Sequence, residues 1–125
     1  MSYSDYLENK VQAHVFSGTA YTSPTLYVGL FTSATADDGS GTEVSGGAYA
    51  RQAMSMSTTG DSSTNSAAVE YPTATASWGT VTHMAIYDAA SGGNMLAHGA
   101  LTASKIIDSG DVFRFPSGDV DITLS

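Results

Sequence analysis

After Gly18 the sequence shows no sustained helical period, and this feature constrains the fold more than any other. Short runs of β-forming residues follow one another instead, separated by Gly, Ser, Asp and Pro. Such an alternation of short apolar runs with turn residues predicts strands joined by turns. The chain is therefore expected to be mainly β, an antiparallel sandwich or barrel of about seven strands with one N-terminal helix.

Two regions give the clearest strands. Residues 26–32 are apolar on both faces, which favours a central strand in which Gly29 lets a backbone or a ring approach closely. Residues 80–88 alternate two faces and, with 95–101, predict a hairpin in which Tyr87 lies opposite Asn94. Two further strands are expected at residues 48–56 and 67–71.

The remaining segments are richer in turn residues. The polar tract 57–66 is expected to be a surface loop, and the glycine-rich segment 33–47 an extended arm. The sequence Ser-Gly-Asp-Val occurs at 109–112 and again at 117–120, each time as a predicted turn before alternating apolar residues. The chain is thus expected to end in two adjacent strands.

Residues 2–17 are the one segment with a helical pattern. Apolar positions spaced three and four apart predict an amphipathic helix that docks by this stripe, formed by Leu7, Val11, His14 and Val15. Ser4 or Asp5 is expected to cap its start, and Gly18 to end it in a left-handed conformation.

The length of 125 residues is that of one domain. We therefore expect a single domain over 1–125, with the helix at 2–17, the arm at 33–47 and the β domain at 26–125. Neither a targeting segment nor a membrane span is indicated by the pattern.

Charge and cysteine content narrow the possible functions. The chain has no cysteine, which excludes disulfides, thiolate chemistry and zinc ribbons. Twelve acidic residues against four basic ones give a net charge of −8, which disfavours binding to nucleic acid or to anionic membranes. Only 13% of residues are charged, against about 25% in an ordinary soluble domain, so much of the polar surface is expected to be hydroxylated.

Common catalytic motifs are absent from the sequence, and three weaker patterns remain. In the predicted hairpin register His83 faces His98, a pair that could share a metal ion but lacks further ligands. Residues 37–43 crowd carboxylates as a calcium loop would, without the expected spacing. Glu70, near Trp78, is the most suggestive catalytic carboxylate, but strand acids more often face water. We therefore predict no catalytic residue, no metal and no cofactor.

Aromatic residues and a few ions are the better candidates for an interface. Arg51 is one of only four cations and could pair with a carboxylate of a neighbouring subunit or with one of its own chain. The interface candidates are Asp37, Asp38, Glu43, Tyr49, Arg51 and Trp78.

Several stretches along almost the whole chain resemble the small tailed-bacteriophage virion proteins commonly labelled phage tail fibre proteins. They are residues 5–9, 26–31, 43–47, 49–52, 65–68, 72–83 and 99–101. The resemblance implies a non-enzymatic virion building block present in many copies, and it supplies no catalytic residues. The outline of a compact β domain with a helix and an arm equally suits a capsid decoration, or cement, protein.

These observations favour a structural protein of a tailed-phage virion. Its expected partners are other virion proteins, either the major capsid protein or tail proteins, and further copies of itself. The alternative hypothesis is a carbohydrate-binding module, in which Trp78 with Tyr49, Tyr71 or Tyr87 stacks on sugar rings.

Overall fold

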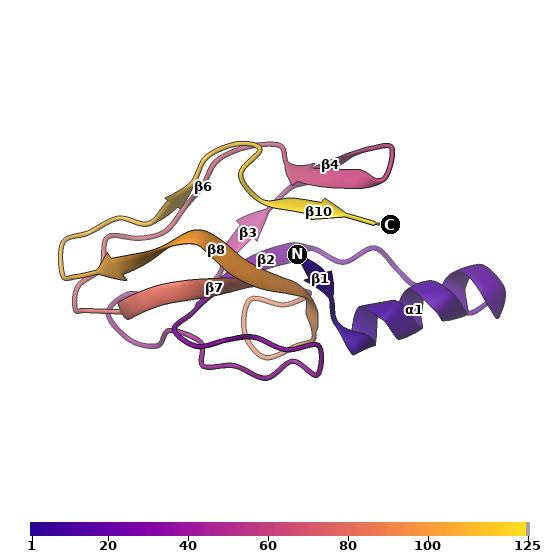
Figure 1. Ribbon diagram of the computed structural model, residues 1–125, viewed down its shortest axis with the longest axis horizontal. Helices are drawn as coiled ribbons and strands as arrows, with labels where there is room; N and C mark the ends of the chain where they lie inside the picture. Colours follow the sequence, from indigo (N-terminus) through magenta and orange to yellow (C-terminus); the bar gives the residue numbers. More distant parts are fainter. Residues whose placement is uncertain (125) are drawn as a thin grey trace.

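The computed structural model describes residues 1–124 and is mainly β. Its single described helix is α1 (Asp5–Phe16). Its ten described strands are β1 (Ser2–Tyr3), β2 (Leu26–Phe31), β3 (Gln52–Met54), β4 (Met56–Thr59), β5 (Ser62–Asn65), β6 (Val69–Glu70), β7 (Gly79–Tyr87), β8 (Met95–Ile107), β9 (Arg114–Phe115) and β10 (Asp121–Thr123). They form three antiparallel sheets in the orders β1-β8-β7-β2-β3, β10-β5-β4 and β6-β9 (Figure 1). The expected antiparallel β fold with one N-terminal helix is confirmed. Its described strands are more numerous than predicted and most are short, whereas β8 continues beyond the predicted 95–101 to Ile107.

The hairpin of β7 and β8 is the longest feature of the five-stranded sheet. Its register differs from the prediction: Tyr87 pairs with Met95, His83 lies opposite Ala100, and His98 lies opposite Ala85. An irregularity between Val81 and His83 also reverses the alternation, so that Val81 joins Met84 and Ile86 in the core. Such a bulge is a local feature that the period of the sequence does not reveal.

The predicted surface loop at residues 57–66 is instead largely a second hairpin, made by β4 and β5. Thr59 pairs with Ser62 around the two-residue turn Gly60-Asp61. Thr58 Oγ1 and Ser63 Oγ lie 2.7 Å apart across the strands. Threonine pairs well across strands, and a two-residue turn starting with glycine fits a tight hairpin, so polarity alone was a poor guide here.

The end of the chain also differs from the prediction of two adjacent strands. β9 pairs with β6, whereas β10 pairs with β5, and the two belong to different sheets. The buried side chain of Asn65 holds the segment between them. Its Nδ2 donates to the carbonyls of Ala67 and Pro116, and its Oδ1 accepts from Val120 N at 2.8 Å.

The two faces of the five-stranded sheet have unequal cores. The larger cluster includes Leu30, Ile86 and Val81 from this sheet, and Phe113 and Phe115 from around β9. On the other face, Phe31, Ala85, Tyr87 and Met95 form a small cluster. This second cluster lies beneath the segment that follows β2 and therefore positions it.

That segment, residues 33–47, does not extend as the predicted arm. Thr32 N donates to Thr42 O, and Val44 N donates to Leu30 O at 2.9 Å, so the chain returns alongside β2. Glu43 forms an isolated bridge with Phe31. Burial of Val44 and pairing of Glu43 hold the returning segment on its own domain, where an extended arm was expected.

Helix α1 projects from the body of the molecule (Figure 1). Ser4 caps its start by accepting a hydrogen bond from Leu7 N, and Gly18 follows its end with φ of +71°, both as predicted. The predicted docking is wrong for most of its length, because no residue of the helix is buried. Tyr6 and Leu7 pack against the main core, while Val15 and Phe16 are 60% and 76% exposed. No helix in residues 1–124 has the length and apolarity needed to cross a membrane.

Candidate functional site

Arg51 joins two loops that lie far apart in the sequence. Its Nε and Nη2 donate to the two carboxylate oxygens of Glu43, both at 2.8 Å. Its Nη1 donates to the carbonyls of Ala89 and Gly92 in the turn after β7. The guanidinium also lies 3.5 Å from the centre of the Tyr87 ring. Arg51 therefore pairs within its own chain, which is one of the two alternatives that its sequence left open.

Tyr49 extends this network into the sheet. Its hydroxyl donates to Glu43 Oε2 at 2.6 Å and accepts from Leu30 N at 3.0 Å. Burial, together with the hydrogen bond to Glu43, raises the pKa of Tyr49 far above its usual value. The neutral phenol is thus held as a fixed donor between a carboxylate and a backbone amide.

Gly29 makes room for this network, as the sequence predicted for a close approach. A Cβ atom at Gly29 would lie 2.8 Å from Glu43 Oε2 and 3.2 Å from the Tyr49 hydroxyl. The carboxylate therefore sits directly over the backbone of the central strand.

Trp78 lies inside an aromatic cluster and is only 4% exposed. Its Nε1 donates to Gly47 O at 2.8 Å, and its ring meets Tyr49 and Tyr71 edge to face. Gly47 has φ of +59°, and a Cβ atom there would lie 2.8 Å from Trp78 Nε1. Tyr71 and Tyr87 are buried as well. The rings proposed as a sugar-stacking platform are therefore packed inside the domain.

The acids of the predicted calcium loop point to separate partners. Asp37 Oδ1 lies 2.7 Å from His98 Nε2, and Thr35 Oγ1 lies 2.8 Å from the other ring nitrogen. Asp38 is exposed and accepts from Ser40 N. Hydrogen bonding by the Ser40 side chain, followed by that of the Ser40 backbone amide, lowers the pKa of Asp38. Glu43 is taken by Arg51 and Tyr49. Within residues 1–124, no three potential ligands are grouped as a metal site requires.

The other two chemical candidates lie away from these residues. His83 bonds its neighbour Thr82 and lies opposite Ala100, so the register that would have set it opposite His98 does not occur. Glu70 is exposed and faces Arg114 across the β6–β9 ladder.

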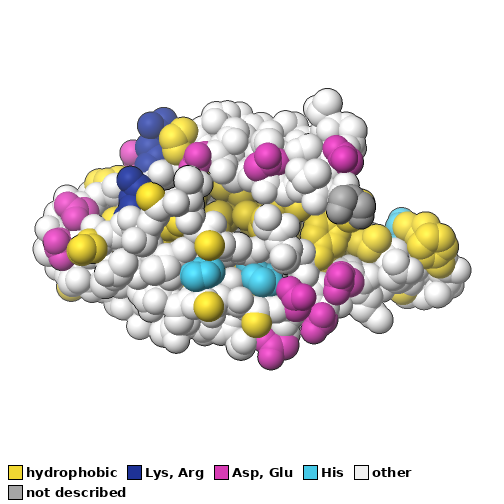
Figure 2. Space-filling view, in the orientation of Figure 1, with side chains coloured by type: hydrophobic (Ala, Val, Ile, Leu, Met, Phe, Trp, Pro, Cys, Tyr) yellow, Lys and Arg dark blue, Asp and Glu magenta, His cyan; other side chains and the backbone are white. Residues whose placement is uncertain are grey.

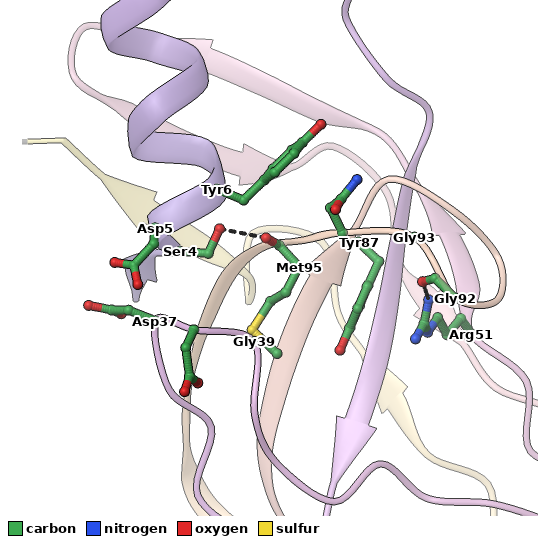
Figure 3. A pocket seen from close by; sticks show the side chains of 12 residues that line it. Ser4, Asp5, Tyr6, Asp37, Gly39, Arg51, Tyr87, Gly92, Gly93 and Met95 are labelled. Atoms are coloured by element: carbon green, nitrogen blue, oxygen red, sulfur yellow. Dashed lines mark hydrogen bonds between the residues drawn. The ribbon is translucent and has the colours of Figure 1, made fainter.

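A pocket of about 590 Å³ opens between the start of α1, the tip of the 33–44 loop and the turn after β7. Asp5 and Asp37 lie on one side and Arg51 on the other, with the Tyr87 ring nearer Arg51 (Figure 3). Asp5 N donates to Asp37 O, and this hydrogen bond joins the start of the helix to the loop. The sequence pointed to Asp37, Asp38 and Arg51 but missed Asp5 and the hairpin turn, because only the folded chain brings them together.

A second exposed feature is the end of α1. Hydrophobic side chains gather on the projecting end of the molecule (Figure 2), where Val15 and Phe16 are exposed. The stripe predicted from the sequence included Val15 but not Phe16, and it did not show that the outer half of the helix lacks a cover in the single chain.

Together these observations define a small, mainly antiparallel β protein with one projecting helix, in which most candidate polar residues bond within the chain. The family model of podophage GP4 fiber I protein gp80 matches residues 2–123, so the chain belongs to this family of phage fibre proteins. It is accordingly a structural component of a virion, as the resemblance in its sequence implied. No curated protein matches the chain.

Proposed function

We propose that the chain is a non-enzymatic, tail-fibre-type component of the podophage particle, present in several copies and held there by contacts of its projecting helix. The observation that supports this proposal is the helix itself. α1 extends beyond the body with Val15 and Phe16 exposed side by side at its end, and contiguous exposed apolar side chains are typical of an interaction site. The description of the family as fibre proteins favours the tail over a cement role on the capsid.

The polar residues support a structural role in a different way. Glu43, Tyr49 and Arg51 bond one another, and Asp37 pairs with His98. A catalytic acid or base needs to be free to exchange a proton with a substrate. These residues instead fix the 33–44 loop to the sheet and to the hairpin turn, which suits a rigid building block.

The test is the number and position of copies in purified particles. Quantitative mass spectrometry against the major capsid protein gives the copy number, and gold labelling of a tagged chain gives the position. A small number of copies on the tail supports the proposal. Copies over the whole head, in proportion to the capsid protein, would assign the chain to capsid decoration instead.

A binding assay addresses the sugar hypothesis. Trp78 is the only tryptophan, so its fluorescence reports on one site. With Trp78 buried, its emission should be blue-shifted and unchanged by host polysaccharide. A change on adding polysaccharide would favour carbohydrate binding.

A further inference from the structure

An apolar groove lies at the base of the same helix whose end is exposed. It has a volume of about 300 Å³ and is bordered by α1, the segment that follows it, the five-stranded sheet and the β4–β5–β10 sheet. Its main apolar residues are Leu7, Pro24, Leu26, Met56, Ile86 and Ile122. Most of these side chains are only half-buried, so the groove is an incompletely covered extension of the core. The hydroxyl of Tyr21, which also borders the groove, is buried without a hydrogen-bond partner among residues 1–124.

We propose that the end of α1 in one copy, bearing Val15 and Phe16, occupies the apolar groove of a second copy in a reciprocal, twofold pair. This inference rests on the proposed structural role, which requires a cover for the helix end. It adds the identity of the partner and the surface that the partner offers.

The geometry of the helix requires the groove of another copy. The end of α1 cannot reach the groove of its own chain. Leu7 lies at the groove, and Phe16 is nine residues beyond it, about 14 Å along a rigid helix. Two antiparallel helices related by a twofold axis near Val11 would bring Val15 of one level with Leu7 of the other, while Phe16, about 100° further round the helix, flanks the contact. Each copy then contributes one helix end to the groove of its partner and one groove to the helix end of its partner.

Charge also favours a second copy. Each copy has a net charge of −8, so two copies repel one another wherever acidic surfaces meet. Residues 11–36, which include the tip of the helix, contain no Asp, Glu, Lys or Arg. The residues that border the groove are uncharged as well. A contact between the helix end and the groove therefore brings no acidic side chains together. The antiparallel arrangement also places Glu8 of one helix level with His14 of the other.

The contact between two copies would be small. The groove is bordered by twelve residues, of which Ile86, Leu96 and Ala97 are already buried within the single chain. With the outer half of the helix, each copy contributes fewer than about 20 residues, below a standard interface, so the pair is expected to be weak. The border of the groove is mainly apolar, as the centre of an interface requires.

Sedimentation velocity of the full chain over a range of concentrations tests the proposal. We expect a monomer–dimer equilibrium, and the double variant Val15→Ser with Phe16→Ser should weaken it about tenfold or more. Ile106→Ser is the matched control, because Ile106 is 66% exposed and lies near the C-terminal end of β8, far from α1 (Figure 1). A wild-type chain that stays monomeric up to about 1 mM would overturn the proposal, as would equal weakening by the control.

A charge exchange tests whether the tip lies in the groove. Thr58 is exposed at the rim of the groove, so Thr58→Glu should weaken the pair, and Val15→Lys should do so from the other side. A mixture of the two variants should associate more tightly than either alone, because one tip–groove contact then joins Lys to Glu and the other is unaltered. A mixture that associates no better than the single variants would contradict this mode of contact.

Incorporation of the chain and its variant into particles separates a failure of this inference from a failure of the proposed function. If the chain is monomeric but present in particles, and the Val15→Ser, Phe16→Ser variant is lost from them, another virion protein covers the helix and self-docking is wrong. If the chain dimerises but is absent from particles, the proposed function is wrong and the pair remains.

Discussion

The guanidinium of Arg51 and the carboxylate of Glu43 form a two-bond ion pair in which only 8% of the Arg51 side chain is exposed. The same guanidinium holds two carbonyls of the turn after β7, so one side chain fixes the 33–44 loop and the hairpin together. Removal of either partner leaves the other without its counterion in a largely covered site.

Arg51→Ala should lower the free energy of unfolding by about 3 kcal/mol, because it leaves the Glu43 carboxylate unpaired. Urea denaturation at neutral pH measures this loss. Arg114→Ala is the control, since Arg114 is exposed and its loss should cost no more than about 0.5 kcal/mol. If the two variants are equally stable, the ion pair does not hold the loops.

Gly29→Ala should also destabilise the protein, by about 1–3 kcal/mol, because the new methyl group would displace Glu43 and Tyr49 from the central strand. The matched control is Gly99→Ala, where the nearest atom would lie at an ordinary 3.4 Å. Thermal unfolding followed by circular dichroism compares the two. A Gly29→Ala protein as stable as the control would contradict the close packing over β2.

The buried tyrosines predict a loss of stability at alkaline pH. The pKa of Tyr49 and that of Tyr71 are raised in the folded state, chiefly by burial. Above the unfolded pKa of about 10 the unfolded chain releases these protons first, so stability is complete below that pH and falls above it.

Above that pH the free energy of unfolding should fall by up to about 1.4 kcal/mol per pH unit for each tyrosine. Urea unfolding of the wild type and of Tyr49→Phe at a series of pH values measures it, and the other titrating groups cancel in the comparison. The phenylalanine variant should lose stability less steeply, and parallel curves for the two proteins would argue against a buried neutral phenol.

Asn65→Ala should be among the most destabilising changes of a polar residue, at about 3 kcal/mol, since it leaves two carbonyls and the amide of Val120 without their buried partner. Asn9→Ala on the exposed surface of α1 serves as the control and should change stability by no more than about 0.5 kcal/mol. Chemical denaturation checks both, and similar midpoints would mean that water replaces the side chain of Asn65.

Much of the framework was predictable from local pattern. The strand at 26–32 was evident because its residues are apolar on both faces, and its glycine correctly indicated a close approach. The two caps of the helix followed from Ser4 and Gly18, which have specific conformational roles at helix ends. In these cases the physical cause lies within a few residues of the position predicted. The predicted start at residue 2 was wrong, because Ser2 and Tyr3 pair with β8 as strand β1 and the helix begins at Asp5.

The errors share a different cause, which is that the deciding partner lies far away in the sequence. Irregularities between Ile86 and Tyr87 and between Val81 and His83 change the register along the β7–β8 hairpin, and the polar β4–β5 hairpin is completed by β10. Arg51 had two possible partners until the fold placed Glu43 beside it. The stripe on α1 was recognised, but a stripe does not state whether its own domain covers it.

Because no residue of α1 is buried and Val15 and Phe16 are exposed at its projecting end, substitutions there should leave the β domain folded. Selection can therefore change the choice of attachment point without endangering folding. Sequence variation among relatives is expected to concentrate at the projecting end of α1, while the residues around Arg51 are expected to vary little.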